Sequence, residues 1–497
     1  MLEDDELTAV SFNIIVTLLL VSKPPLDPSN LSSDQRNKRR RLRFIVQIAF
    51  SAALGGFLFG YDTAVINGAV GAIGTVFSTS KEILGFAVAS ALLGSALGAL
   101  LAGWLSDQIG RRQSMLIAAL MFLASALGSA FAPTLASLII WRVVGGLAIG
   151  FASVLAPAYI AEISPASMRG QLGSLQQLAI VIGIFLALLF DYVIVLFTSD
   201  HNPVSVVGPL AAWRWMLLSE IIPAALYAVL VMGIPESPRY LVQKGLLQRA
   251  KVVIDKTLNE SADKVIARIQ SSLVHTNSGN LGELFDRHTI LLPIIWTGVM
   301  LAIFQQFVGI NVIFYYSSVL WQAVGFNATD SLVVTVITSI TNVVTTLIAI
   351  AFIDRLGRKP LLLAGSLLMA LNLGLMSWAF AGASVVNGSP QLAGVGAVVA
   401  LIAANLFVFS FGFSWGPVMW VMLGEMFNNR IRAMALGLCA MVNWIANFLI
   451  ADTFPHLLEH WGPALAYGLY ATAAAISFFL VLFFVRETRG KELEEMA

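Results

Sequence analysis

A carboxylate and several amides lie inside stretches of sequence that are otherwise apolar. Asp62 belongs to the segment GYDTAVINGA, within an apolar run from 44 to 70. The segment IFQQFVGINVIFYYS places Gln305, Gln306 and Asn311 in a similar setting. A buried carboxylate needs a cation or a proton, and buried amides need hydrogen-bonding partners. These residues predict ion chemistry at one place and recognition of a polar ligand at another.

The elements that carry these residues are apolar helices. The chain has 497 residues, of which 58% are hydrophobic and 11% charged, against about 25% charged in a soluble domain. A spanning helix needs about 20 mostly apolar residues. Twelve such windows recur, at 44–70, 83–104, 113–133, 135–158, 171–197, 213–234, 288–320, 331–354, 358–381, 395–424, 432–452 and 464–485. The sequence therefore predicts an all-α membrane protein with twelve transmembrane helices.

The charges predict the orientation of these helices. Lys and Arg gather in alternate loops, including Arg36–Arg43, the central segment and the C-terminal tail, whereas the other loops are nearly bare apart from Lys81. By the positive-inside rule, both termini and the central loop are expected in the cytoplasm. No basic tract alternates with aromatic residues, so nucleic acid is not an expected partner. The single cysteine, Cys439, excludes an intramolecular disulfide.

Repeated motifs divide the chain into two halves. DQIGRR at 107–112 matches DRLGRK at 354–359, and EISPASMRG in the first half parallels EMFNNRIR in the second. The polar segment between the halves has apolar residues at helical spacing, which predicts short amphipathic helices. The expected domains are an N-terminal cytoplasmic extension (1–43), a six-helix bundle (44–234), a cytoplasmic helical linker (235–287), a second six-helix bundle (288–485) and a cytoplasmic tail (486–497).

The expected depths of residues in the membrane identify a partner for Asp62. The first span is expected to run outward, which leaves Asp62 roughly 12 Å below its outer end at 1.5 Å per residue. The fourth span runs inward and places Arg142 roughly 10 Å below its outer start. An Asp beside Arg stays ionised, whereas an Asp moved into an apolar setting takes up a proton. A change in their separation would tie proton binding to conformation, although a permanent structural pair is the alternative interpretation.

The ordered motifs resemble those of a known family. GYDTAVINGA, GWLSDQIGRR, WRVVGG, PESPRYLVQKG, QQFVGINVIFYYS, DRLGRKP, SWGPVMW and RETRGKELEE are similar to motifs of the sugar porters of the major facilitator superfamily. The resemblance covers nearly everything from residue 44 onward. It implies the major facilitator fold, a substrate site between the halves, and proton-coupled import of a hexose, with glucose the first candidate, by alternating access.

The resemblance also assigns roles to residues. It implies proton coupling at Asp62 and Arg142. It implies sugar contacts at Gln177, Gln305, Gln306, Asn311, Tyr315, Asn342, Trp420, Asn443 and Trp444. It implies a network of gating ion pairs at the inner ends of the helices, formed by Asp107, Arg111, Arg112, Glu162, Arg169, Glu236, Arg239, Asp354, Arg358, Glu425 and Arg432. For the amides, interhelical hydrogen bonding that only holds the helices together is the alternative.

Other residues carry weaker expectations. Glu220 has no cation at matching depth apart from Arg214 and is interpreted as structural, and Asp191 is expected to be wetted near the outer end of the fifth span. Gly412, Gly416 and Pro417 should loosen the tenth span. The spacing of Gly94 with Gly98, and of Gly146 with Gly150, indicates close helix packing. Arg486 replaces a proline common in the family, so the last helix is expected to continue through it.

Alternative functions remain on the sequence evidence. A proton-coupled symporter for a pentose or a cyclic polyol such as inositol would use a similar pocket. A facilitative uniporter is disfavoured by Asp62. A sugar sensor of this fold usually has longer cytoplasmic tails. No motif of nucleotide or metalloenzyme chemistry is present, so an enzyme, a cofactor and a metal are not expected. The expected partners are the sugar, a proton as coupling ion and membrane lipid, with the single chain as the functional unit in the plasma membrane.

Overall fold

The computed structural model describes residues 33–165, 169–198, 200, 202–258, 260–275, 285–286, 290–323, 325–386, 389–392, 394–427 and 431–488. Within these residues it confirms the all-α fold, with 12 segments long and apolar enough to span a membrane. They are Arg39–Val76, Lys81–Ile109, Arg111–Ala130, Leu135–Ile163, Leu175–Leu196, Ala212–Gly233, Pro293–Ser318, Thr329–Ile353, Arg358–Ala381, Val395–Met426, Met434–His460 and Gly462–Phe484. The eleventh has the largest difference at a single boundary, because the helix continues past Asp452 to His460.

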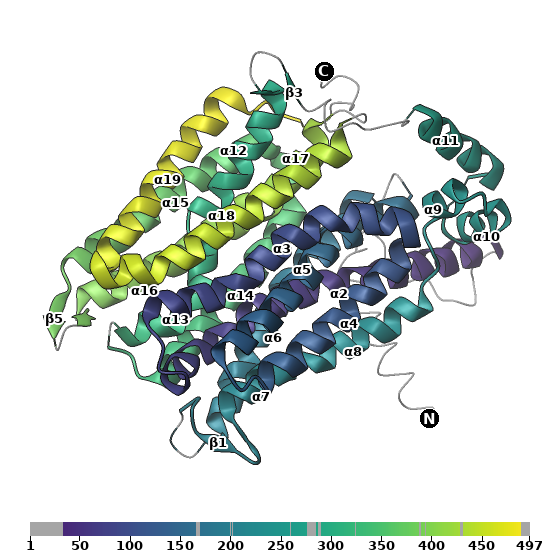
Figure 1. The fold of residues 1–497 in the computed structure, drawn as a ribbon. Coiled ribbons are helices and arrows are strands. Elements are labelled where there is room, and N and C mark those ends of the chain that lie inside the picture. Colours follow the sequence, from purple (N-terminus) through teal and green to yellow (C-terminus); the bar gives the residue numbers. More distant parts are fainter. Residues whose placement is uncertain are drawn as a thin grey trace.

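The helices form two groups that follow the order of the sequence. The first group is α2 (Ser33–Val76), α3 (Lys81–Ile109), α4 (Arg111–Ala130), α5 (Leu135–Ile163), α6 (Arg169–Leu196), α7 (Ala212–Ser219) and α8 (Ile221–Gly233). The second is α12 (Pro293–Phe307), α13 (Ile310–Ala323), α14 (Ala328–Leu356), α15 (Arg358–Ala381), α16 (Val395–Gly412), α17 (Trp415–Met426), α18 (Arg432–His460) and α19 (Gly462–Phe484). Figure 1 shows the purple-to-blue first group on one side and the green-to-yellow second group on the other.

Three short helices lie together at one end of the bundle, which we call the linker side. They are α9 (Pro238–Gln243), α10 (Leu247–Thr257) and α11 (Ala262–His275), and their apolar faces form a small separate core around Leu241, Ile254 and Val265. The amphipathic helices predicted between the halves are therefore present. The N-terminal part of α2 extends to this end, where Arg41 Nη1 donates to Leu258 O at 2.9 Å (Figure 1).

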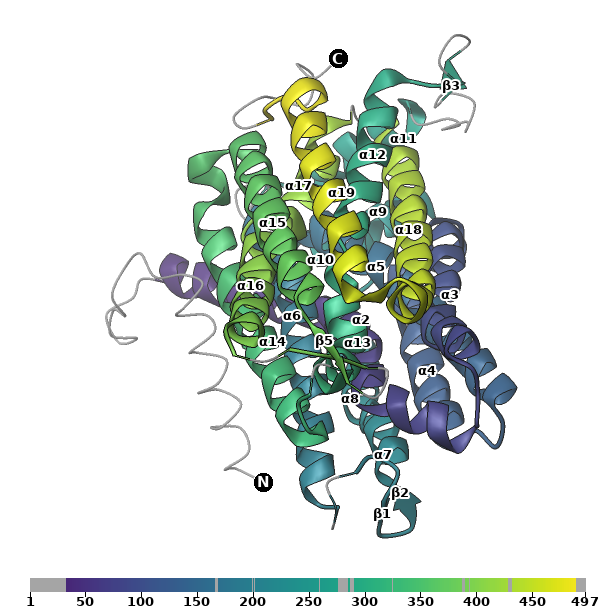
Figure 2. The ribbon, with the colours of Figure 1, turned by 90° about the vertical axis from the view of Figure 1, so that its left-hand side faces the viewer.

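Small two-stranded hairpins, which the sequence analysis did not predict, join some of the helices. The hairpins β1 (Val206–Val207) with β2 (Leu210–Ala211), and β5 (Ser384–Val386) with β6 (Ser389–Gln391), lie at the end opposite the linker helices, which we call the far side (Figure 2). The hairpin β3 (Phe285–Asp286) with β4 (Ile290–Leu291) precedes α12 on the linker side.

Three spans are interrupted near their middle. The sixth breaks at Glu220, between α7 and α8, and the tenth breaks between α16 and α17. Each break lies three or four residues before a proline, Pro223 or Pro417, because a proline clashes with the carbonyl four residues earlier. The seventh breaks between α12 and α13 at Gly309, whose φ of 79° suits glycine. The loosening predicted for the tenth span is confirmed, whereas the other two breaks were not anticipated.

Glycines bring two helices of the first group into backbone contact. A Cβ at Gly94 or Gly98 of α3 would lie 2.3 or 2.4 Å from a carbonyl oxygen of α5. A Cβ at Gly146 or Gly150 of α5 would lie 1.9 or 2.3 Å from a carbonyl oxygen of α3. The close packing predicted from the GxxxG spacing is therefore confirmed, and only glycine fits at these positions.

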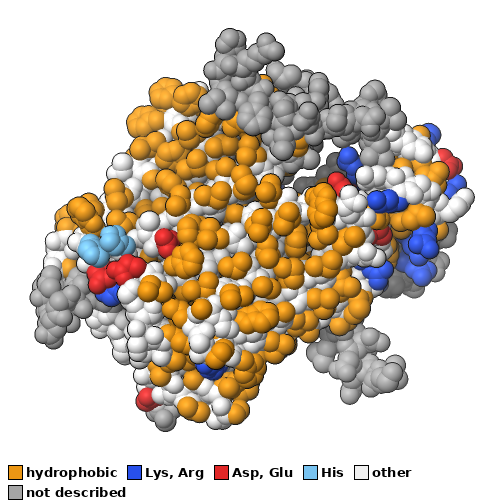
Figure 3. All heavy atoms as spheres, in the orientation of Figure 1, with side chains coloured by type: hydrophobic (Ala, Val, Ile, Leu, Met, Phe, Trp, Pro, Cys, Tyr) orange, Lys and Arg blue, Asp and Glu red, His pale blue; other side chains and the backbone are white. Residues whose placement is uncertain are grey.

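The two groups meet along three pairs of helices, α3 with α18, α6 with α14, and α2 with α13. The outer surface of the helices is apolar, with Trp104 at 65% and Phe483 at 72% exposure. Figure 3 shows this hydrophobic surface over the helices, with charged side chains gathered toward the ends. The distribution is that of a protein whose long faces contact lipid.

Candidate functional site

Asp62 and Arg142 form a buried ion pair between α2 and α5. Arg142 Nη1 lies 2.5 Å from Asp62 Oδ1 and donates also to Asp62 O at 3.2 Å. The two residues are only 1% and 3% exposed. The pairing predicted from depth is therefore present. Within the described residues, Asp62 Oδ2 and Arg142 Nε have no hydrogen-bond partner, so the pair keeps unused polar capacity inside the bundle.

Glu220 lies beside this pair, which contradicts the expectation that Arg214 is the one cation at its depth, and its interpretation as structural stays a prediction. It interacts electrostatically with both Asp62 and Arg142 and is 2% exposed. The expected cation, Arg214, instead donates to Ala130 O and Ala132 O at 2.5 and 3.1 Å. The break after α7 sets the position of Glu220. Two carboxyl groups around one guanidinium reach neutrality by binding one proton.

Asp191 is buried, which contradicts the expectation of a wetted residue. Its exposure is 0%, and its Oδ2 accepts the backbone N–H of Gly68 at 3.1 Å. Its Oδ1 has no hydrogen-bond partner among the described residues. The prediction counted residues to the end of the fifth span, but packing of α2 against α6 covers this position.

Four of the predicted sugar-contacting amides form one hydrogen-bonded cluster. Asn443 Nδ2 donates to Gln305 Oε1 at 2.7 Å and to Ala302 O at 2.9 Å. Gln306 Nε2 donates to Gln305 Oε1 at 3.1 Å and to Asn443 Oδ1 at 3.0 Å. Asn311 Nδ2 donates to Gln306 Oε1 at 2.7 Å. The cluster joins α12, α13 and α18, and we call it the amide cluster.

The break at Gly309 changes how these residues meet. The sequence predicts the seventh span as one continuous segment, 288–320. In the structure Gln306 lies in the last turn of α12 and Asn311 in the first turn of α13, so their side chains meet across the break. Each amide both donates and accepts hydrogen bonds, which is the chemistry that recognition of a ligand's hydroxyl groups requires.

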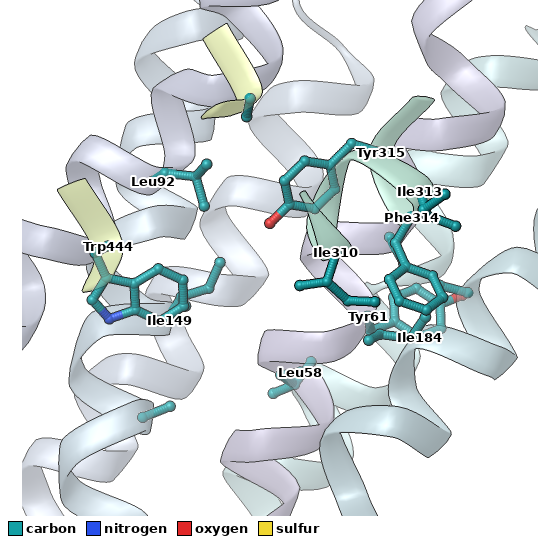
Figure 4. Close-up of a cluster of buried hydrophobic side chains, with 14 of the residues drawn as sticks. Leu58, Tyr61, Leu92, Ile149, Ile184, Ile310, Ile313, Phe314, Tyr315 and Trp444 are labelled. Carbon is teal, nitrogen blue, oxygen red and sulfur yellow. The ribbon is translucent and has the colours of Figure 1, made fainter. Parts of the chain in front are cut away.

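Aromatic side chains of the second group border the first group near the amide cluster. Trp444 is 2% exposed, its indole lies 4.9 Å from the Phe59 ring, and its Nε1 has no partner among the described residues. Tyr315 Oη accepts from Asn447 Nδ2 at 3.2 Å. Figure 4 shows Tyr315 and Trp444 among Leu58, Leu92 and Ile149 of the first group. An apolar wall with a few polar atoms is the usual lining of a small-molecule site.

The remaining residues that were predicted to contact the sugar lie on other helices. Gln177 on α6 and Trp420 on α17 are half-buried, and Asn342 on α14 is 6% exposed. The sequence analysis missed Asn447, which holds the hydroxyl of Tyr315. Asn447 follows Asn443 by one helical turn, so the i, i+4 spacing was the signal that could have identified it.

The ion pairs that the structure describes in the charged network on the linker side each join residues of the same half. Arg111 pairs with Asp107 at 2.9 Å and with Glu162 at 3.3 Å. Arg358 pairs with Glu425 at 2.8 Å. Arg112 donates to the carbonyls of Val231 and Met232, and the backbone N–H of Arg239 donates to Ser237 Oγ. The side chains of Arg169, Asp354 and Arg432 lie outside the described residues, so their predicted pairs stay predictions.

Two glutamates cap equivalent helices of the two halves. Glu236 accepts the backbone N–H groups of Arg111 and Arg112 at the start of α4. Glu487 accepts those of Arg358 and Lys359 at the start of α15, at 3.0 Å each. Negative charge is favourable at a helix N-terminus. Burial raises the pKa of Glu236, and these backbone hydrogen bonds oppose the shift.

The repeated Asp-x-x-Gly-Arg motif provides room for these caps. Gly110 has a φ of 99° and Gly357 one of 90°. A Cβ at Gly110 would lie 2.3 Å from Glu236 Oε2, and a Cβ at Gly357 would lie 2.8 Å from Glu487 Oε2. The expectation that the last helix continues through Arg486 is wrong, because α19 ends at Phe484 and the following chain brings Glu487 to its cap.

Comparisons with known proteins agree with this architecture. The family model described as "Sugar (and other) transporter" matches residues 48–497. The chain is 54% identical over 467 residues to a glucose transport protein of Synechocystis sp., covering 94% of this chain and 100% of the relative. It is 37% identical to the D-xylose–proton symporter of Escherichia coli, over 93% and 96% of the two chains.

A solved structure shares the fold. The proton:xylose symporter of the major facilitator superfamily, bound to 6-bromo-6-deoxy-D-glucose, matches with a TM-score of 0.77 and 36% identity. The match covers 92% of this chain and 99% of that one.

Proposed function

Because the chain belongs to the sugar transporter family of the major facilitator superfamily, we propose that it is a proton-coupled symporter that imports a hexose, with glucose the first candidate. The observation that carries the proposal is the buried Asp62–Arg142 pair with Glu220 beside it. Ionisable residues within spans usually mark ion or proton routes. A passive carrier has no need of this cluster.

The proposed substrate site is the amide cluster with Tyr315 and Trp444. Its supports are the amides that face one another between α12, α13 and α18, and the glucose transport protein that is 54% identical. A pentose is the second candidate, since a D-xylose–proton symporter is 37% identical. The structure that holds 6-bromo-6-deoxy-D-glucose is a xylose symporter, so a bundle of this type accepts a hexose ring.

The proposed orientation places the linker side, with both termini, in the cytoplasm, and the protein in the plasma membrane. The support is the basic residues of the linker-side loops. On the far side, Asn67 of α2 donates to Phe314 O at 2.8 Å and to Ser317 Oγ at 3.0 Å, both on α13 of the other group. With the far side outside, these hydrogen bonds join the two groups of helices on the exterior side.

Proton movement supplies enough energy for accumulation. About 100 mV of membrane potential is worth about 2.3 kcal/mol per charge. At 1.4 kcal/mol per factor of ten, one proton per sugar sustains a concentration ratio of roughly 50.

Uptake of labelled glucose into proteoliposomes tests the proposal, with and without an inward proton gradient and with internal pH recorded. We expect accumulation with acidification. Asp62→Asn should abolish accumulation while sugar exchange persists. Asp452→Asn, a carboxyl of α18 in the other group, serves as the matched control and should still accumulate sugar. Equilibration that ignores the gradient would reject symport, and equal loss of exchange and accumulation in Asp62→Asn would make Asp62 structural.

A further inference from the structure

Asp191 is a buried carboxyl group that the sugar and proton sites described above do not use. It lies on α6 at 0% exposure, and its one hydrogen bond comes from the backbone N–H of Gly68 at 3.1 Å. No described Lys, Arg or His forms an ion pair with it, in contrast to Asp62. An ionised carboxylate would be an uncompensated charge here, whereas the neutral acid would not.

The space around Asp191 is shaped for a carboxyl group. A Cβ on Gly68 would lie 2.7 Å from Asp191 Oδ2 and 2.8 Å from its Cγ, so glycine is required for α2 to approach this side chain. The other oxygen, Oδ1, has no hydrogen-bond partner among the described residues. A proton on Oδ1 would remove the charge without disturbing the contact to Gly68.

A chain of polar groups runs from Asp191 toward the Asp62 pair. Tyr61 interacts electrostatically with both Asp191 and Glu220, and its hydroxyl lies 2.6 Å from Ser219 Oγ. Its ring lies 6.5 Å from that of Phe190, the neighbour of Asp191 on α6. Ser219 Oγ itself donates to Met216 O at 2.5 Å, and Ser219 precedes Glu220, the carboxyl group beside Asp62, at the break of the sixth span.

Asp191 lies between this pair and the far side of the molecule. Gly68 follows Asp62 by six residues on α2, about 9 Å further from the linker side. The titratable or charged groups on the helices packed around α6 include Tyr61 and Asp62 on α2, Arg142 on α5, Arg214 on α7, Glu220 before α8, Tyr192 on α6 itself and Asp330 at the start of α14. Of these described groups, Tyr61 is the one that interacts electrostatically with Asp191.

We propose that Asp191 is a second proton-binding site, which takes a proton from the far side and passes it by way of Tyr61 and Ser219 to the Glu220–Asp62–Arg142 cluster. The relay rests on the proposed proton symport. The bound proton comes from the external solution, and the carboxylate is regenerated when the proton moves inward, so each passage leaves Asp191 ready for the next.

Infrared difference spectroscopy tests proton binding without any transport. The purified parent near neutral pH should show the C=O stretching band of a protonated carboxyl group that is missing in Asp191→Asn. This substitution keeps the acceptor for the Gly68 N–H, and Asp452→Asn is the matched control that should leave the band unchanged. An identical spectrum in parent and Asp191→Asn would show an ionised Asp191 and overturn the proposal, even if symport itself is correct.

Transport tests the relay. In cells, the external proton concentration that gives half-maximal glucose uptake should rise about ten-fold in Asp191→Asn, while sugar exchange stays within about two-fold of the parent. Tyr61→Phe removes the hydroxyl and should shift the profile in the same direction, so it decides the question if Asp191→Asn does not fold. Unchanged pH profiles in both variants would reject the relay, and absence of proton coupling in the parent would instead reject the proposed function.

Discussion

Substitution of Asn311 separates a sugar site from a cluster that only joins helices. Asn311 Nδ2 makes a single hydrogen bond, to Gln306 Oε1. Asn443 takes part in three hydrogen bonds, of which two lie within the amide cluster and one goes to a backbone carbonyl. A lost hydrogen bond costs about 1 kcal/mol of stability. Asn311→Ala should therefore destabilise the protein by about 1 kcal/mol, and Asn443→Ala by about 3 kcal/mol.

The effect on sugar binding should not follow this order. Asn311 is only half-buried and stands at the break, where a ligand hydroxyl can reach its amide. One lost sugar contact of about 1.4 kcal/mol weakens binding about ten-fold. The assay is glucose titration of purified protein by calorimetry, with thermal unfolding measured on the same samples.

A matched control is available in the same half. Asn372 is buried, and its Nδ2 donates to Leu368 O at 2.8 Å, away from the amide cluster. Asn372→Ala should lose stability comparable to Asn311→Ala and bind glucose as the parent does. Unchanged affinity in a folded Asn311→Ala protein would refute the proposed pocket and leave the amides with a purely interhelical role.

Two further predictions concern the glutamate caps on the linker side. Gly110→Ala and Gly357→Ala should each lower the free energy of unfolding by about 1 to 3 kcal/mol from backbone strain alone, with the larger loss at Gly110 because its Cβ would lie closer to the capping carboxylate. Gly245→Ala, at φ 74° but in open space, is the control, and equal losses in thermal unfolding at all three sites would contradict the cap. Because burial raises the pKa of Glu236, its contribution to stability is present at low pH and is lost as pH rises through its raised pKa. The stability of the parent relative to Glu236→Gln should therefore fall as the pH rises above the ordinary glutamate pKa of about 4.3, and a constant difference would contradict the shift.

Much of the fold was predictable because lipid imposes a strong constraint. Each spanning helix must satisfy its own backbone and expose apolar side chains, so hydropathy finds the spans. The Asp62–Arg142 pair was also predictable, since both helices are continuous at these residues and depth scales with residue number. The same count placed Asp191 in water, because it gave height along the helix but not which neighbour covers it.

The interrupted spans account for most of what the sequence analysis missed. Glu220 meets the Asp62 pair because the helix ends there, three residues before Pro223. Asn311 meets Gln306 because Gly309 turns the chain between them. Helical periodicity assumes a continuous helix, so it fails at the residues beside a break. Pro223 and Pro417 were visible signals, whereas a glycine such as Gly309 marks a break only after its backbone conformation is known.

The location of the breaks suggests which helices move and which transmit motion. Freed backbone groups inside a membrane need polar surroundings, so breaks and polar side chains are expected together. Helix α2, in contrast, is uninterrupted from Ser33 to Val76 and carries Asp62, Asn67 and Gly68, which contact α5, α13 and α6 respectively. A change of charge at Asp62 therefore acts on a continuous helix that also holds α13 through Asn67. The short helix α13 begins after Gly309 and carries Asn311 of the amide cluster and both acceptors of Asn67, so a displacement of α13 would change the amide cluster and the far-side contact together.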